Sequence, residues 1–174
     1  MKDIPFPDDG HWQNKHLNLL SAGYRKAPFF DVLAPVLDTV YQTRHHTMVD
    51  FNVMLIQGVR NLLGIATPVY RESELGDDFG DGSARNLQIC RHFGAGVYLS
   101  GQGARSYNDK ASFREAGIEL VYQEFQHEPY EQGPGEFFPN LSILDMLCYL
   151  GPEATAEIVK RRCWTSKYDS RDES

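Results

Sequence analysis

The chain has 174 residues, of which 41% are hydrophobic and 24% are charged, a balance that is ordinary for a globular protein. Lysine and arginine number 17 against 24 aspartates and glutamates, so the net charge is -7. This acidic balance argues against general binding to nucleic acid or to anionic membranes. No run approaches the roughly 18 apolar residues of a membrane span, and the first residues contain no apolar signal core. We therefore expect a cytoplasmic protein with no nucleic-acid partner and no membrane span.

The cysteines and histidines predict neither a metal site nor a cofactor. Cys90, Cys148 and Cys163 are far apart and odd in number, which is typical of reduced thiols. The six histidines include the adjacent pair His45 and His46. None of them stands at the spacings that four zinc ligands require.

Three helices are predicted in the first part of the chain. Residues 11–24 and 29–44 carry apolar side chains at helical spacing. Residues 48–63 are apolar on more than one face, which is typical of a buried helix. Thr47, with Asp50 three residues later, forms a variant of the capping box and predicts the start of that helix.

A unit of helix, glycine and strand then occurs three times. The predicted strands are residues 67–70, 96–100 and 118–123, and each contains a Val-Tyr pair. Glycine stands where each preceding helix should end, because a left-handed backbone costs least there. These glycines are Gly64, Gly94 and Gly117. The Val-Tyr pairs are 28 and 24 residues apart, which suits parallel crossovers and predicts about three parallel strands.

The last part of the chain predicts a loop followed by two helices. Residues 131–136 are rich in proline and glycine, as loops are. A helix should follow, with either Asn140 or Ser142 as its N-cap. Gly151 and the proline after it should break that helix, and residues 153–162 should form a final one.

These elements predict an α/β fold, as a helix-rich single domain with a small parallel sheet. We place the domain at residues 1–165 and a polar tail at residues 166–174.

The predicted topology indicates where a ligand site should lie. Ligands of open parallel sheets bind beyond the carboxyl ends of the strands. The loop over residues 100–107 follows the second strand, and its glycines would let backbone N–H groups approach an anion. Arg105 could pair with a carboxylate or a phosphate. The predicted ligand-binding residues are Ser100, Gly101, Gly103, Arg105, Gln123, Tyr130, Asn140 and Ser142.

Two other interpretations of this loop remain open. Gly101 and Gly103 could begin a dinucleotide fingerprint, with Glu124 as its acidic residue, although Ser106 stands where the third glycine belongs. The loop could also be a plain turn with no ligand.

Three residues are catalytic candidates. His127 lies near the end of the third predicted strand and could be a general acid or base; the alternative is an exposed loop histidine. Asp145 is either a catalytic carboxylate or a helix-start carboxylate that faces the helix dipole. Tyr107 lies close behind Arg105 and is the third candidate.

A series of short motifs runs in order from Trp12 to about residue 155. They are Trp12 with Lys15-His16-Leu17, the run from Ala22 to Phe30, Ser73 to Gly76, Tyr98 to Tyr107, Val121 to Gln123, Pro129-Tyr130, Phe138 to Leu147, and Gly151 to Ala154. Taken together, this series resembles the WbqC-like protein family.

The resemblance implies a role in the biosynthesis of bacterial O-antigen and related surface polysaccharides. It implies an acyl or aminoacyl transferase, of the glycine type, whose substrate is a small molecule or nucleotide-sugar. The alternative is a non-catalytic module that binds a nucleotide or sugar, and a homo-oligomer remains open in either case. Family members begin with a strand and a Gln-Pro-x-Tyr-x-Pro-Trp segment, which this sequence lacks. We therefore expect a chain that is short by a first βα unit and by part of any site.

Overall fold

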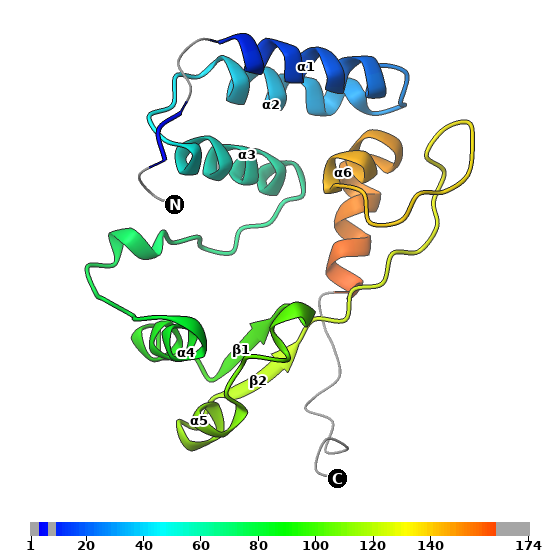
Figure 1. Ribbon diagram of the computed structural model, residues 1–174. Coiled ribbons are helices and arrows are strands. Elements are labelled where there is room, and N and C mark those ends of the chain that lie inside the picture. The colour runs from blue at the N-terminus through cyan, green and yellow to red at the C-terminus, as the bar shows by residue number, and fades with distance from the viewer. Residues whose placement is uncertain (1–3, 7–9, 163–174) are drawn as a thin grey trace. The chain divides into compact units, whose positions relative to one another are not determined.

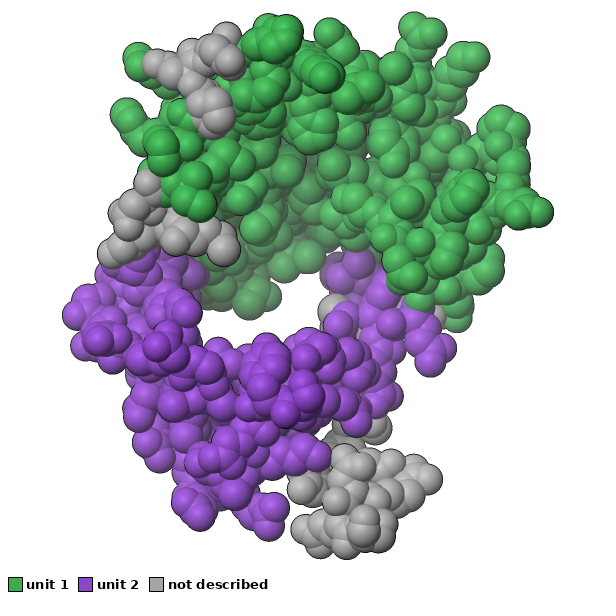
Figure 2. All heavy atoms as spheres, in the orientation of Figure 1, with its two compact units in different colours: residues 1–69, 127–158 green, residues 70–126, 159–174 purple. Residues whose placement is uncertain are grey.

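The computed structural model (Figure 1) describes residues 4–6 and 10–162, which fall into two compact units (Figure 2). Unit 1 is formed by the residues up to Val69 together with His127–Ile158. Unit 2 is formed by Tyr70–Gln126 and the described residues from Val159 onward. The predicted tail at residues 166–174 and Cys163 lie outside the described residues.

Unit 1 begins with three consecutive helices that pack on one another in chain order (Figure 1). They are α1 (His11–Tyr24), α2 (Phe30–Gln42) and α3 (Met48–Leu62), which confirms the three predicted helices. The predicted capping box is also present. The Thr47 hydroxyl accepts a hydrogen bond from the backbone N–H of Asp50 at 3.2 Å, and the Thr47 N–H donates to the Asp50 carboxylate at 3.1 Å.

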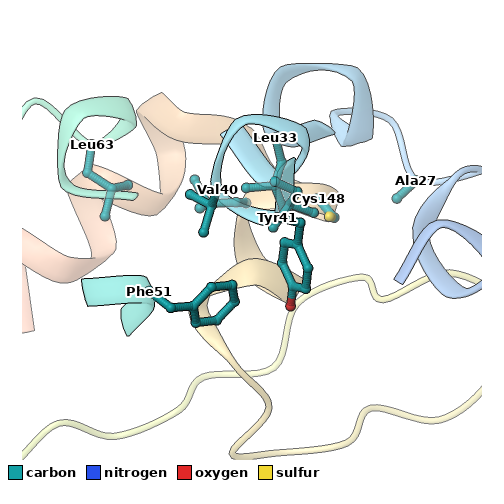
Figure 3. Close-up of a cluster of buried hydrophobic side chains, with 9 residues drawn as sticks. Ala27, Leu33, Val40, Tyr41, Phe51, Leu63 and Cys148 are labelled. Carbon is teal, nitrogen blue, oxygen red and sulfur yellow. The ribbon is translucent and has the colours of Figure 1, made fainter. Parts of the chain in front are cut away.

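The hydrophobic core of unit 1 joins these helices to the last helix, α6 (Ile143–Arg162). Figure 3 shows Val40 and Tyr41 of α2 close to Phe51 of α3 and to Cys148 of α6. The buried core residues are Ala27, Leu33, Leu37, Val40, Tyr41, Phe51, Leu63, Leu147 and Cys148. Helices α2 and α3 approach closely at Gly58, where a methyl group would collide with the side chain of Val36.

Helix α6 is interrupted at the predicted position. Gly151 has φ 78° and ψ 170°, which separates two helical segments. This conformation is accessible almost only to glycine, and a methyl group here would lie 2.9 Å from the ring of Phe29. At the start of the helix, the Ser142 hydroxyl accepts from the Leu144 N–H at 3.3 Å. Ser142 rather than Asn140 is therefore the capping residue.

Unit 2 is built around two short parallel strands that lie side by side (Figure 1). Its main elements are α4 (Gly82–His92), β1 (Val97–Ser100), α5 (Lys110–Glu115) and β2 (Glu119–Tyr122). The strands pair in register, with Val97 opposite Glu119 and Ser100 opposite Tyr122. Two single-turn 3₁₀ helices, η1 (Glu72–Glu74) and η2 (Gln102–Ala104), lie in the connections.

Helices α4 and α5 supply the core of unit 2. Phe113 of α5 is fully buried and stacks on Tyr98 of β1, with ring centroids 5.3 Å apart. Leu87 and Cys90 of α4 belong to the same cluster. The glycine at the end of each of these helices has a positive φ, which confirms the predicted helix stops; they are Gly94 at 61° and Gly117 at 70°.

The predicted strand over residues 67–70 is wrong. These residues form no strand, so the parallel sheet of the described ranges has two strands rather than about three. Pro68 has no N–H to donate to a strand ladder. Val69 and Tyr70 are exposed, and the Tyr70 ring packs on Phe93 with centroids 4.8 Å apart. The predicted class, helix-rich α/β with a small parallel sheet, is confirmed.

None of the helices in the described ranges has the length and apolarity needed to cross a membrane.

Candidate functional site

Six of the predicted site residues lie in unit 2, where the two strands end. They are Ser100, Gly101, Gly103, Arg105, Tyr107 and Gln123. Ser100 is the last residue of β1, and its carbonyl accepts from the backbone N–H of Gln123 at 2.8 Å, just beyond β2. The parallel pairing therefore brings the two strand ends together.

A buried polar cluster lies beneath this strand end. Ser100, Asn108 and Tyr122 are 3%, 8% and 7% exposed. The amide of Asn108 donates to the Ser100 hydroxyl oxygen at 3.1 Å and to the Tyr122 hydroxyl oxygen at 3.3 Å. The Asn108 Oδ1 atom is buried and has no hydrogen-bond partner among the described residues. The hydrogen bonding of the cluster is therefore incomplete, and a buried polar atom without a partner normally destabilises the folded state.

Arg105 lies above the cluster and is held from two sides. Its guanidinium carbon is 4.9 Å from the centroid of the Tyr122 ring, which is a cation–π distance. Its Nη2 donates to Glu124 Oε1 at 3.2 Å, and the two side chains are 47% and 42% exposed. The chain thus supplies a carboxylate to Arg105. The dinucleotide interpretation would use Glu124 for a ribose, whereas here Glu124 pairs with Arg105.

The glycine loop forms a 3₁₀ turn. The N–H groups of Ala104 and Arg105 donate to the carbonyls of Gly101 and Gln102, at 3.0 and 3.1 Å. These two amides are used inside the turn and do not point at a shared anion. Tyr107, a predicted catalytic residue, is 60% exposed.

The remaining predicted residues lie in unit 1, around a buried carboxylate. Asp145, in the first turn of α6, is 3% exposed. Its Oδ1 atom accepts from the Tyr130 hydroxyl at 2.6 Å and from the Gln132 amide at 3.0 Å. Tyr24 of α1 also makes a side-chain hydrogen bond with Asp145. Donors from distant segments of the chain thus surround this carboxylate, beyond what the helix dipole alone provides.

The groups around Asp145 are held in their protonated forms. Burial, followed by the charge of Asp145 and a hydrogen bond to it, raises the pKa of Tyr24 to about 12. Burial and the same charge raise the pKa of Cys148 to about 12. Burial and the hydrogen bond to Asp145 also raise the pKa of Tyr130. At neutral pH the phenols therefore serve as donors, and the Cys148 thiol is a poor nucleophile.

His127 is linked to Asp145 through aromatic contacts. Its ring centroid is 6.3 Å from that of Tyr130 and 6.3 Å from that of Phe137. Tyr130 and Phe137 meet edge to face at 5.4 Å. Three predicted residues, His127, Tyr130 and Asp145, therefore lie in one continuous group.

The loop before α6 accounts for the last two predicted residues. Ser142 caps the helix, and Asn140 has a left-handed backbone with φ 63°. Gln132, which was not predicted, closes the loop by bonding both the N–H and the carbonyl of Phe138, at 2.8 and 3.1 Å. Asn108 of unit 2 was also missed, because nothing in its local sequence distinguishes it from a surface asparagine.

In the described ranges, no group of three or more histidine, cysteine, aspartate or glutamate side chains could hold a metal ion.

Comparisons with known proteins identify a family and a relative. The model of the WbqC-like protein family matches residues 1–157. An uncharacterised protein of Mycobacterium tuberculosis, Rv1507c, is 31% identical over 150 residues, which cover 84% of this chain and 64% of that protein. The chain thus spans less than two thirds of the length of this relative. No solved structure matches.

Proposed function

Because the chain belongs to the WbqC-like protein family, we propose that it acts in the biosynthesis of bacterial surface polysaccharides such as O-antigen. In this proposal it is an acyl or aminoacyl transferase that modifies a sugar. The anionic part of one substrate, a carboxylate or a phosphate, binds at Arg105.

The observation that carries the proposal is the position of Arg105. It lies beyond the carboxyl end of a parallel strand, where ligands of such sheets bind, and its side chain is about half exposed. Tyr122 fixes the guanidinium from one side. Glu124 accepts a hydrogen bond from Nη2 of this guanidinium, so an incoming anion competes with Glu124 for that donor.

The proposed reaction is a simple acyl transfer. A hydroxyl or amino group of the sugar attacks the acyl carbonyl carbon, and a new ester or amide bond forms. The bond between that carbon and its leaving group breaks, and the attacking group gives its proton to a base. His127 is the proposed base, because an imidazole is the side chain that most often serves as a general base. The contacts of its ring with Tyr130 and Phe137 would keep it in place.

The second candidate is a binding module without catalysis. The hydrogen bonds that Asp145 already accepts favour this candidate, because they leave the carboxylate to position other groups and not to catalyse. Such a module would hold a nucleotide-sugar or sugar without converting it.

Ligand-induced thermal stabilisation tests the proposal. The full chain is heated with UDP-N-acetylglucosamine, with glycine and without ligand. We expect at least one ligand to raise the melting temperature. Arg105→Ala should abolish that rise, whereas Glu124→Gln should increase it, because the competing carboxylate is gone. Arg114→Ala, an arginine of α5 in the same unit, is the matched control.

The two candidates differ in turnover. Mass spectrometry of the sugar after incubation with an activated acyl donor detects the transferred group. Product that depends on His127 supports the transferase, and binding without product supports the module. If neither ligand raises the melting temperature, or if Arg105→Ala leaves the rise unchanged, the assignment of the ligand to Arg105 is wrong.

A further inference from the structure

Unit 2 contains a polar pocket formed by residues that precede β1 in the chain. Its volume is about 320 Å³, which is in the range of small-molecule sites. Three of its residues come from the segment before α4 and three from the last turns of α4. They are Asp77, Asp78, Phe79, Gln88, Arg91 and His92. None of them takes part in the contacts of Arg105 or of the cluster beneath it.

His92 is held in a fixed orientation within this pocket. Its Nδ1 atom lies 2.9 Å from Asp77 Oδ2. The rings of Phe79 and Phe93 contact the imidazole edge to face, with centroids 5.5 and 5.0 Å away. A carboxylate at Nδ1 favours the tautomer with its proton on that nitrogen, which leaves Nε2 as a hydrogen-bond acceptor.

Arg91 provides a cation to this pocket. Its guanidinium lines the pocket and makes no ion pair with any residue in the described part of the chain. Asp78 is partly used, because its Oδ1 accepts from the N–H of Gly80 at 3.0 Å. The pocket therefore offers one strong donor, one imidazole acceptor, two carboxylates and the carboxamide of Gln88.

We propose that this pocket binds a sugar that carries an anionic group. The guanidinium of Arg91 pairs with the carboxylate or phosphate of the sugar. The His92 Nε2 atom accepts a hydrogen bond from a sugar hydroxyl. Asp77 and Asp78 accept hydrogen bonds from other hydroxyls of the sugar, which offsets their repulsion of its anionic group. Inorganic phosphate has no sugar hydroxyls, so it should bind more weakly.

Helix capping explains only part of this arrangement. Cationic side chains in the last turn of a helix interact favourably with its dipole, and Arg91 and His92 stand in the last turn of α4. The dipole does not require a carboxylate on His92 Nδ1, nor a pocket whose polar side chains come from two separate segments.

Calorimetric titration of the full chain with four probes tests the proposal. The probes are glucuronate, glucose 1-phosphate, glucose and inorganic phosphate. We expect saturable binding of one or both anionic sugars, and the one that binds identifies the anionic group. Arg91→Gln should weaken that binding about tenfold or more. His92→Gln should weaken it as well, and Asp77→Asn should do so less.

Controls separate this site from the one at Arg105. Arg114→Gln and Arg105→Ala should leave the binding of the anionic sugar unchanged. Urea unfolding of each variant checks that the fold is retained, and a shift of histidine side-chain NMR signals on titration provides a second measurement. If only the binding of the ligand at Arg105 is lost, that result bears on the proposed transferase and leaves the inference about this pocket unaffected.

Four results would overturn the inference. They are a lack of saturable binding by both anionic sugars, an unchanged affinity in Arg91→Gln, inorganic phosphate binding as tightly as glucose 1-phosphate, and loss of binding in Arg105→Ala. The third would indicate a simple anion site, and the fourth would place the sugar at the strand ends.

Discussion

The carboxylate of Asp145 in unit 1 is enclosed by donors, whereas the guanidinium of Arg105 in unit 2 is half-exposed beside the carboxylate of Glu124. Both charges lie next to buried polar groups. Around Asp145 the partners come from α1 and from the loop before α6. Beneath Arg105, the carbonyl of Asn108 has no partner among the described residues.

This difference separates a structural role from a binding role. A buried charge is stable only when its hydrogen bonds are complete, and removing one partner is then costly. An exposed ion pair contributes little to stability, so its members can exchange partners when a ligand arrives. We therefore assign Asp145 to holding unit 1 together and Arg105 to meeting a ligand.

The largest effect is expected from Asp145→Ala. It leaves the Tyr24, Tyr130 and Gln132 donors without their acceptor inside the protein. We expect the free energy of unfolding to fall by about 4 kcal/mol, measured by urea denaturation. Asp31→Ala, an exposed first-turn aspartate of α2, is the matched control, and its cost should be below about 1 kcal/mol. Equal costs for the two variants would contradict the structural role.

Gly151→Ala should have the next largest effect. The backbone at φ 78° and ψ 170° is strained for alanine, and its methyl group would press on the ring of Phe29. We expect a loss of about 3 kcal/mol. Gly96→Ala is the control, because nothing lies within 4 Å of its added methyl group and its φ is not positive. A small effect at Gly151 would mean that the bend in α6 is not enforced by this glycine.

Alkaline pH should weaken unit 1. Burial and the charge of Asp145 raise the pKa of Tyr24 from 10.0 to about 12, so above pH 10 the unfolded chain loses this proton before the folded one. The unfolded state then binds fewer protons, and stability falls as the pH rises. Cys148, raised from 9.0 to about 12, acts with the same sign. We expect the shift of Tyr24 alone to remove about 2 kcal/mol of stability between pH 10 and pH 12, measured by urea unfolding at each pH.

The same titration has an internal control. Asp145→Ala removes the negative charge that disfavours the phenolate, so the pH dependence of this variant should be shallower. Tyrosinate absorbance of the folded protein should likewise rise at lower pH in the variant. A slope that is identical in both proteins would show that burial alone governs these groups.

Asn108→Ala should have a smaller effect. It removes two hydrogen bonds to Ser100 and Tyr122, but it also removes the buried carbonyl that has no partner. The two contributions oppose each other, so we expect a loss of about 1 kcal/mol in urea denaturation. A loss as large as that of Asp145→Ala would mean that the two clusters contribute equally to stability.

The parts of the fold that follow from local chemistry were predictable. Thr47 and Asp50 cap a helix with each other's groups, and Gly94 and Gly117 end helices because of their own backbone freedom. The strand predicted over residues 67–70 does not form, because a strand needs a partner, which local sequence does not reveal, and Pro68 cannot donate to one.

The site shows the same limit. Sequence indicated that Arg105 follows a strand, but it could not show that Glu124 pairs with it. For Asp145 the sequence leaves two roles open, a helix-start carboxylate or a catalytic one. Its actual partners, Tyr24 and Gln132, are set by tertiary packing and carry no local signal.

The smallest effect on stability is expected for the pair of Arg105 and Glu124. Their side chains are 47% and 42% exposed, so a double-mutant cycle with alanine at both positions should give a coupling of about 0.5 kcal/mol. Added salt should reduce the coupling, because exposed charges are screened. A coupling of several kcal/mol would mean that the pair is structural like Asp145, and Glu124 would then be a permanent partner of Arg105. A weak coupling leaves the guanidinium available, because a ligand carboxylate that brings its own bidentate hydrogen bonds can then displace Glu124 at little cost in stability.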